Sequence, residues 1–323
     1  MSAKTIVRRK KGQKSHQLFL GIDGGGTKTH AVLIDEFGEI AGEGFSGASN
    51  PLRVGIERAV GNIFKAADNA CDAAGRSRTD IVAIECGLAG VRREDLRRSV
   101  RQRISDNYRL KAVEVLTDAE IALYSVNSGK AALVVIAGTG SICFGRDDKG
   151  ETAIAGGWGP LAGDEGGGAG IARHALQAVA KAVDGRGEPT VLSRYATEYF
   201  RTSTPEDVMV AIYTPQTDNA KIAGFARFVV KAAKEKDKIA LEILREGGAE
   251  LGIAAIAVIK KLKLQKKKLP IGFVGSVFKA GKFITDSLIE TVHIKAPNAF
   301  LVEPKLSPAQ AAAEMAIKLT QIK

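Results

Sequence analysis

The sequence predicts an α/β protein made of two copies of one domain type, each a mixed sheet covered by helices. Length is the first observation, because 323 residues with 45% apolar composition suffice for two domains. The second is a pattern of strands and turns that occurs twice, and the third is the alternation of strands and helices after the first copy. Two such domains would face each other across a cleft.

The repeated segments are LGIDGGGTKTHAVLIDEFGEIAGE and VIAGTGSICFGRDDKGETAIAG. Each copy is expected to form a strand, a small-residue turn with Gly-Thr at its tip, a second strand, a D-x-x-G-E hairpin turn and a third strand. Residues of the first copy recur in the second at one offset of about 112 positions. They are Gly26, Thr27, Asp35, Gly38, Glu39 and Ala41, which match Gly138, Thr139, Asp147, Gly150, Glu151 and Ala153.

Helical and strand patterns follow each copy. Apolar residues at helical spacing predict a helix over residues 56–75, closed by Gly75, and a charged helix over 92–103. IVAIECGLAG and AVEVL read as strands, and Asp118 stands where the second of these meets a helix. Residues 186–260 read mostly as helices, LPIGFVGSV as a strand, and SPAQAAAEMAIKL as a closing helix capped by Ser307.

Cysteine and histidine spacing argue against several metal sites. Cys71, Cys86 and Cys143 form no C-x-x-C pair, which indicates a reduced, intracellular protein without a cysteine-built zinc or iron–sulfur site. The four histidines show no H-E-x-x-H spacing. The longest apolar stretch, residues 251–259, is too short to span a bilayer, and the basic start lacks the apolar segment of a signal peptide.

The net charge of +11 is concentrated in two runs of lysine and arginine, within residues 4–14 and 260–268. Outside these runs the chain is almost neutral. We interpret residues 1–17 as a disordered basic tail and the second run as a solvated turn. Attraction to nucleic acid or to an acidic surface is the alternative interpretation of this charge.

The two Gly-Thr turns are candidate phosphate sites. Glycines let backbone N–H groups approach an anion, and Thr27 with Lys28 adds a hydroxyl donor and a positive charge. Two such turns would suit a triphosphate. The Walker pattern does not fit, because Thr27 separates Gly26 from Lys28 and a strand follows, and the dinucleotide fingerprint G-x-G-x-x-G is absent from this turn.

The motifs GIDGGGTKT, TDA, AGTGSIC, GGWGPLAGDEGG and FVGSV occur in this order. With them the chain resembles the sugar-kinase branch of the actin-like ATPases, including the BadF/BadG/BcrA/BcrD ATPase family, over residues 18–318. The resemblance implies duplicated ribonuclease H-like (actin-like ATPase) domains, each with a mixed five-stranded sheet flanked by helices, and an interdomain cleft. The first domain would span 18–128 plus the C-terminal helix 308–323, and the second 129–307 with a helical insertion at about 186–260.

The resemblance also implies roles for individual residues. The first turn would hold the β- and γ-phosphates of ATP through Gly25, Gly26, Thr27 and Lys28, with Asp23 oriented toward Mg²⁺ through water. The second turn would supply Gly138, Thr139 and Gly140, and Gly275 with Ser276 would line the adenosine side. Asp118 matches the catalytic base, and the sugar-contacting positions are Asn50, Ser141, Gly157, Trp158, Gly159 and Asp164.

The chemistry of phosphoryl transfer supports these assignments independently of the resemblance. Phosphoryl transfer needs an aligned nucleophile and neutralised charge, so one carboxylate near the acceptor hydroxyl and one metal on the phosphates can suffice. A helix N-terminus keeps the Asp118 carboxylate ionised. The simpler interpretation of Asp118 is an ordinary acid at the start of a helix, and Asp164 with Glu165 could simply cap the following helix.

The leading hypothesis is an ATP-dependent kinase that phosphorylates a hexose or amino sugar at the 6-hydroxyl, with Asp118 as general base and ATP with Mg²⁺ as cofactors. We expect a cytoplasmic homodimer with a small-molecule sugar as partner and neither a membrane nor nucleic acid. One alternative is the activator ATPase of 2-hydroxyacyl-CoA dehydratases, which holds an iron–sulfur cluster between subunits. The other is a regulator that binds sugar or nucleotide without catalysis.

Overall fold

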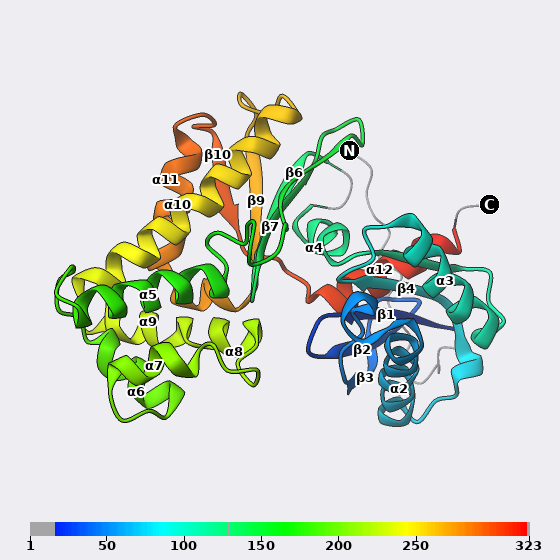
Figure 1. Cartoon of the computed structure of the whole chain (residues 1–323). Coiled ribbons are helices and arrows are strands. Elements are labelled where there is room, and N and C mark those ends of the chain that lie inside the picture. Colours follow the sequence, from blue (N-terminus) through cyan, green and yellow to red (C-terminus); the bar gives the residue numbers. More distant parts are fainter. Residues whose placement is uncertain (1–16, 128–129, 322–323) are drawn as a thin grey trace. The chain divides into compact units, whose positions relative to one another are not determined.

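The computed structural model of the chain describes residues 17–127 and 130–321. The expected basic tail therefore lies almost wholly outside the described residues. The described chain divides into two compact units: a first unit up to Ser125 that also includes the residues from Lys305 on, and a second unit of Val126–Pro304. Each unit is an α/β structure with one five-stranded sheet (Figure 1).

The sheet of the first unit begins with an antiparallel meander, and the remaining two strands run parallel to its first strand. The order across this sheet is β3 (Ile40–Ser46), β2 (Thr29–Asp35), β1 (Leu18–Gly24), β4 (Ile81–Leu88) and β5 (Val113–Thr117). The three strands of the meander come from the first copy of the sequence repeat.

The sheet of the second unit has the same order and the same strand directions. Its strands are β8 (Thr152–Gly156), β7 (Ser141–Arg146), β6 (Ala132–Ala137), β9 (Leu269–Val274) and β10 (Ala299–Val302). The duplication predicted from the repeat is thereby confirmed, together with the mixed five-stranded sheets.

The D-x-x-G-E turns show the repeat in atomic detail. In the first hairpin the Asp35 carboxylate accepts hydrogen bonds from the backbone N–H groups of Phe37 and Glu39, at 2.9 and 3.0 Å. In the second, the Asp147 carboxylate accepts from two backbone N–H groups at the same spacing, at 2.8 and 2.9 Å. One aspartate per copy therefore fixes the turn between the second and third strands, which explains why this residue recurs.

Helices cover both faces of the first sheet. The helices α2 and α3 share one apolar cluster with β1, β4 and β5, whereas α12 packs on the other face. The contact with α12 is close, since a Cβ at Gly21 of β1 would lie 2.1 Å from the carbonyl oxygen of Ala309. The helices of this unit are α1 (Pro51–Val54), α2 (Ile56–Ala74), α3 (Glu94–Tyr108), α4 (Asp118–Val126) and α12 (Pro308–Leu319).

The second unit has a large apolar core under its sheet and helices. Residues 192–261, within the region where the sequence predicts a helical insertion, form five successive helices joined by short loops. The helices are α5 (Gly168–Val183), α6 (Leu192–Phe200), α7 (Pro205–Ala211), α8 (Asn219–Gly224), α9 (Ala226–Lys234), α10 (Lys238–Lys261) and α11 (Lys282–His293) (Figure 1). Across residues 17–127 and 130–321, no helix has the length and apolar character to cross a membrane.

Candidate functional site

The first Gly-Thr turn joins β1 to β2 and is closed by its own backbone. The N–H of Gly25 donates to the carbonyl oxygen of Lys28 at 2.9 Å. Thr27 and Lys28 are exposed at the tip, where a hydroxyl and an ammonium group can meet an anion. The first turn therefore has the shape and the exposed donors that the sequence predicts.

Neighbouring segments hold this turn in place. The carbonyl oxygen of Gly25 accepts from the backbone N–H groups of Ser49 and Asn50, at 3.1 and 3.2 Å, and that of Gly24 accepts from Ala89 at 2.8 Å. A Cβ at Gly24 would lie 2.2 Å from the Oγ of Ser49, so only glycine allows this approach. Rigid backbone support of this kind is what a phosphate-binding turn requires.

Asn50 caps the short helix α1. Its side-chain oxygen accepts from the N–H of Leu52 at 3.0 Å, which leaves the amide nitrogen available to a ligand. Gly90, at φ +83°, lies directly against this side chain, because a Cβ there would stand 2.2 Å from the Asn50 Oδ1. The structure thus fixes the orientation of Asn50 beside the first turn.

Asp118 begins α4 where β5 ends. Its carboxylate accepts from the N–H of Ala119 at 2.9 Å. The neighbouring Glu120 accepts from the N–H and the hydroxyl of Thr117, at 2.7 and 2.8 Å, and from Arg97 of α3 at 3.1 Å. These bonds fix the strand-to-helix junction and with it the position of Asp118.

Asp118 lies close enough to Asp23 for its charge to act on the Asp23 carboxyl group. Burial and then the charge of Asp118 raise the pKa of Asp23 from 3.8 to about 6, while His30 and Lys28 lower it. Burial also raises the pKa of Asp118. Two neighbouring carboxylates beside a phosphate turn fit Mg²⁺, which takes one or two carboxylates, phosphate oxygens and waters. Asp23 is the residue for which the sequence predicts a role toward this metal.

The second turn joins β6 to β7 and is bound to the start of α5. The N–H groups of Gly168 and Ala169 donate to the carbonyl oxygens of Gly138 and Thr139, at 2.8 and 2.9 Å. Thr139 is exposed at the tip, as Thr27 is in the first turn. The repeat has therefore kept the same turn but anchored it to a different helix.

Asp164 supports this second turn from beneath. Its carboxylate accepts from the N–H of Ser141 at 3.2 Å, and the Ser141 hydroxyl donates to the carbonyl oxygen of Glu165 at 2.6 Å. Asp164 is buried and adopts φ +62°, a conformation that non-glycine residues seldom take. The helix begins after Gly167 with no side-chain cap, so neither acid caps it.

The loop after β8 carries the remaining predicted sugar positions. Gly157 and Gly159 have φ of +74° and +84°, and the N–H of Gly157 donates to the carbonyl oxygen of Ser141 at 2.9 Å. Trp158 stands between them with 71% of its surface exposed. An exposed aromatic ring on a tightly turned loop is suited to contact with a ligand.

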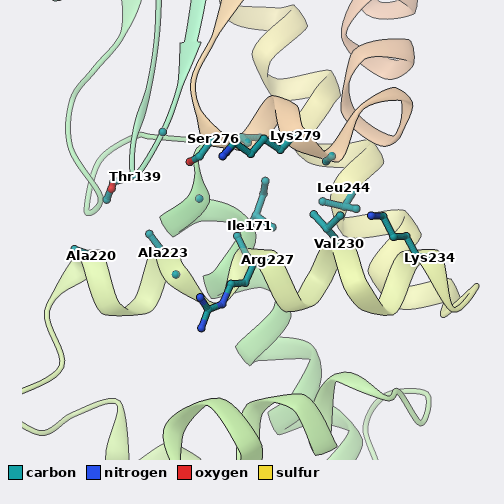
Figure 2. A pocket seen from close by; sticks show the side chains of 16 residues that line it. Thr139, Ile171, Ala220, Ala223, Arg227, Val230, Lys234, Leu244, Ser276 and Lys279 are labelled. Carbon is teal, nitrogen blue, oxygen red and sulfur yellow. The ribbon is translucent and has the colours of Figure 1, made fainter. Parts of the chain in front are cut away.

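A cavity of about 570 Å³ opens beside the second turn, within the second unit. Gly138, Thr139 and Ser276 line one part of it, and Arg227, Lys234 and Lys279 add positive charge (Figure 2). Gly275 does not line the cavity; at φ +120° it packs against the backbone of Ala137, where a Cβ would lie 2.2 Å from the carbonyl oxygen. No carboxylate lines this cavity among the described residues.

The predicted site residues divide between the two units. The first unit holds Asp23, Gly25, Gly26, Thr27, Lys28, Asn50 and Asp118, and the second holds Gly138, Thr139, Gly140, Ser141, Gly157, Trp158, Gly159, Asp164, Gly275 and Ser276. Sequence reasoning missed Arg53, Glu120 and Arg227. Only Glu120 left a signal, since T-x-x-E before an apolar run is the pattern of a capping box.

The chain is similar to known proteins over almost its whole length. An N-acetylmuramic acid/N-acetylglucosamine kinase of Clostridium acetobutylicum is 31% identical over 289 residues, which cover 88% of this chain and 94% of the relative. An N-acetyl-D-glucosamine kinase of Dictyostelium discoideum is 31% identical over 94% of this chain and 98% of its own. A solved structure from Chromobacterium violaceum, named as a candidate N-acetylglucosamine kinase, is 26% identical with a TM-score of 0.78 and covers 93% of this chain and 99% of its own.

The fold and these relatives define an ATP-dependent phosphotransferase built on two actin-like ATPase domains. The predicted fold class and the use of ATP with Mg²⁺ are thereby confirmed. Residues 20–316 match the BadF/BadG/BcrA/BcrD ATPase family, and the chain belongs to this family.

Proposed function

We propose that this protein transfers the γ-phosphoryl group of ATP to a hydroxyl of an amino sugar or hexose, N-acetylglucosamine and glucosamine first among them. The observation that carries the proposal is the placement of Asp118 beside Asp23, in the unit that also holds the first turn and Asn50. A base for the acceptor hydroxyl and a turn for the transferred phosphate are the parts that phosphoryl transfer needs. The three curated relatives, which are kinases of N-acetylmuramic acid, N-acetylglucosamine or glucosamine, support the choice of acceptor.

In this mechanism the Asp118 carboxylate accepts the proton of the 6-hydroxyl of the sugar. The sugar oxygen forms a bond to the γ-phosphorus, the bond from that phosphorus to the β–γ bridging oxygen breaks, and ADP leaves. The N–H of Ala119 fixes one carboxylate oxygen, which leaves the other for the acceptor. Asn50 orients the sugar through its amide nitrogen, and in the second unit Trp158 and Asp164 are the candidate sugar contacts.

Nucleotide binding in this proposal uses both Gly-Thr turns. Gly25, Gly26, Thr27 and Lys28 receive the β- and γ-phosphates, and Thr139 of the second turn donates to the phosphates from its own unit. Bound Mg²⁺ would neutralise phosphate charge, and Asp23 would hold its water ligands. The cavity lined by Ser276 and Arg227 is assigned to adenosine.

The activator-ATPase alternative is disfavoured by where the thiols lie. Cys71, Cys86 and Cys143 are all buried, the first two in the core of the first unit and the third in that of the second. Burial raises the pKa of each thiol, that of Cys71 to about 11. A cluster held between subunits needs cysteines at the subunit surface, so these core residues are poor candidates.

A coupled assay of ADP release tests the proposal. The purified protein with Mg-ATP is given N-acetylglucosamine, N-acetylmuramic acid, glucosamine, glucose or mannose, and the product is examined by ³¹P NMR to locate the phosphate. We expect sugar-dependent ADP release and a 6-phosphate product. ADP release that none of these sugars stimulates would contradict the proposal.

The homodimer and the cytoplasmic location stay predictions. Light scattering coupled to gel filtration tests whether the protein is a homodimer.

A further inference from the structure

Arg53 lies against the first phosphate turn, although it is 27 positions away in the sequence. One guanidinium nitrogen donates to the carbonyl oxygen of Gly26 at 3.1 Å. The contact is close, because a Cβ at Gly26 would lie 2.8 Å from the same nitrogen. The guanidinium group therefore sits at the middle of the turn between Gly25 and Thr27.

The helix that carries Arg53 also carries the cap Asn50. The backbone N–H of Arg53 donates to the carbonyl oxygen of Asn50 at 3.0 Å, so the two residues belong to one turn of α1. The carbonyl oxygen of Gly25 in turn accepts from the N–H of Asn50. A sugar on Asn50 and a phosphate on the turn would therefore both lie close to this helix.

The charge of Arg53 has no partner in the described part of the protein. The side chain is exposed, and no carboxylate lies within 4.0 Å of it in residues 17–127 and 130–321. The bond to Gly26 uses one of five N–H donors. The remaining donors form a planar fork, which matches the oxygens of a phosphate group.

We propose that Arg53 is a catalytic residue that binds the γ-phosphoryl group of ATP and stabilises the charge on it during transfer. This inference rests on the proposed function. The bonds made and broken are those given above: the sugar oxygen bonds to phosphorus, the β–γ bridging oxygen leaves with ADP, and the proton passes to Asp118. Arg53 takes no proton and no electrons, and its contribution is electrostatic.

A purely structural role makes a different prediction. If Arg53 only fixed the carbonyl of Gly26, its loss would disturb the whole turn, and ADP and ATP would bind less tightly by the same factor. If Arg53 contacts the γ-phosphoryl group, only a nucleotide that has this group would lose affinity. The comparison of ADP with the non-hydrolysable imido analogue of ATP therefore separates the two roles.

The test uses three variants of the full chain: Arg53→Gln, Arg53→Lys and, as matched control, Arg58→Gln on the exposed surface of α2. Calorimetry with Mg²⁺ measures the binding of ADP and of the imido analogue. For Arg53→Gln we expect about 10- to 100-fold weaker binding of the analogue, unchanged binding of ADP, and a kcat lowered about 10²- to 10³-fold. For Arg53→Lys we expect an affinity for the analogue and a kcat between those of the natural chain and of Arg53→Gln, because lysine keeps the positive charge but lacks the planar fork of N–H donors.

Equal loss of both nucleotides, or no loss of the analogue, would overturn the role of Arg53. Arg58→Gln should behave as the natural chain, and thermal melting of all variants checks that they fold. The proposed function fails by a different result, namely that the natural chain phosphorylates none of the sugars. The calorimetry would in that case still decide whether Arg53 binds the terminal phosphate.

Discussion

Replacing Glu85 by glutamine should make the protein more stable, and increasingly so as the pH rises. Glu85 lies in the middle of β4 with only 1% of its surface exposed, and its Oε1 has no hydrogen-bond partner among the described residues. Its register partner on the parallel strand β5 is Glu114. Burial, followed by the charges of Glu114 and Glu120, raises the pKa of Glu85 from 4.5 to about 8.

The pKa fixes the sign and the size of the effect. Between pH 4.5 and 8 the folded chain holds a proton on Glu85 that the unfolded chain has released, so the free energy of unfolding falls as the pH rises. At about 1.36 kcal/mol per pH unit, the natural glutamate costs about 3 kcal/mol at pH 7. Glutamine has the same shape and no proton to release, so the variant does not bear this cost.

Urea denaturation followed by circular dichroism at pH 5, 6, 7 and 8 measures the difference. We expect Glu85→Gln to match the natural chain near pH 5 and to exceed it by about 3 kcal/mol at pH 7. The control is Glu57→Gln, which removes an exposed carboxylate paired with Arg103 and should change stability by less than about 1 kcal/mol at every pH. A gain for Glu85→Gln that does not grow with pH would refute the reasoning.

Three further predictions concern the two sites. Asp118→Ala should keep sugar and nucleotide binding but lower turnover about 10²- to 10⁴-fold, and near-normal turnover would remove it from the mechanism. Gly140→Ala should lower stability by about 1–3 kcal/mol in urea, because the new Cβ would stand 2.4 Å from the Asp164 carboxylate, whereas Gly138→Ala meets nothing within 4 Å and should melt normally. Arg227→Ala should weaken ADP binding about 10-fold by calorimetry, and unchanged affinity would exclude this cavity as the nucleotide site.

Local sequence signals predicted much of the fold. The D-x-x-G-E pattern works within five residues, so both hairpin turns could be recognised without knowing the rest of the chain. The helix ends were predictable for the same reason: Gly75 adopts the left-handed conformation that closes α2, and Ser307 forms a capping box with Gln310 at the start of α12.

Contacts between distant segments were not predictable in this way. Arg53 lies in a segment with no motif, and its contact with Gly26, 27 positions away in the sequence, depends on the fold of the chain between them. Glu85 is one acid within the run IVAIECGL, and its pairing with Glu114 depends on the register of β4 and β5. Asp164 was predicted as a helix cap or a sugar contact, but its bond to Ser141 follows from a left-handed backbone that the residue type does not indicate.

The packing of α12 on Gly21 also has a consequence for biosynthesis. This helix is translated after the whole second unit, yet it covers β1, which is translated before that unit. During translation, one face of the first sheet therefore stays uncovered until the second unit and α12 have been made, at which point the second unit already has all its strands. A chain shortened before Pro308 should therefore expose apolar surface and aggregate or be degraded, even though both glycine-rich turns would be present.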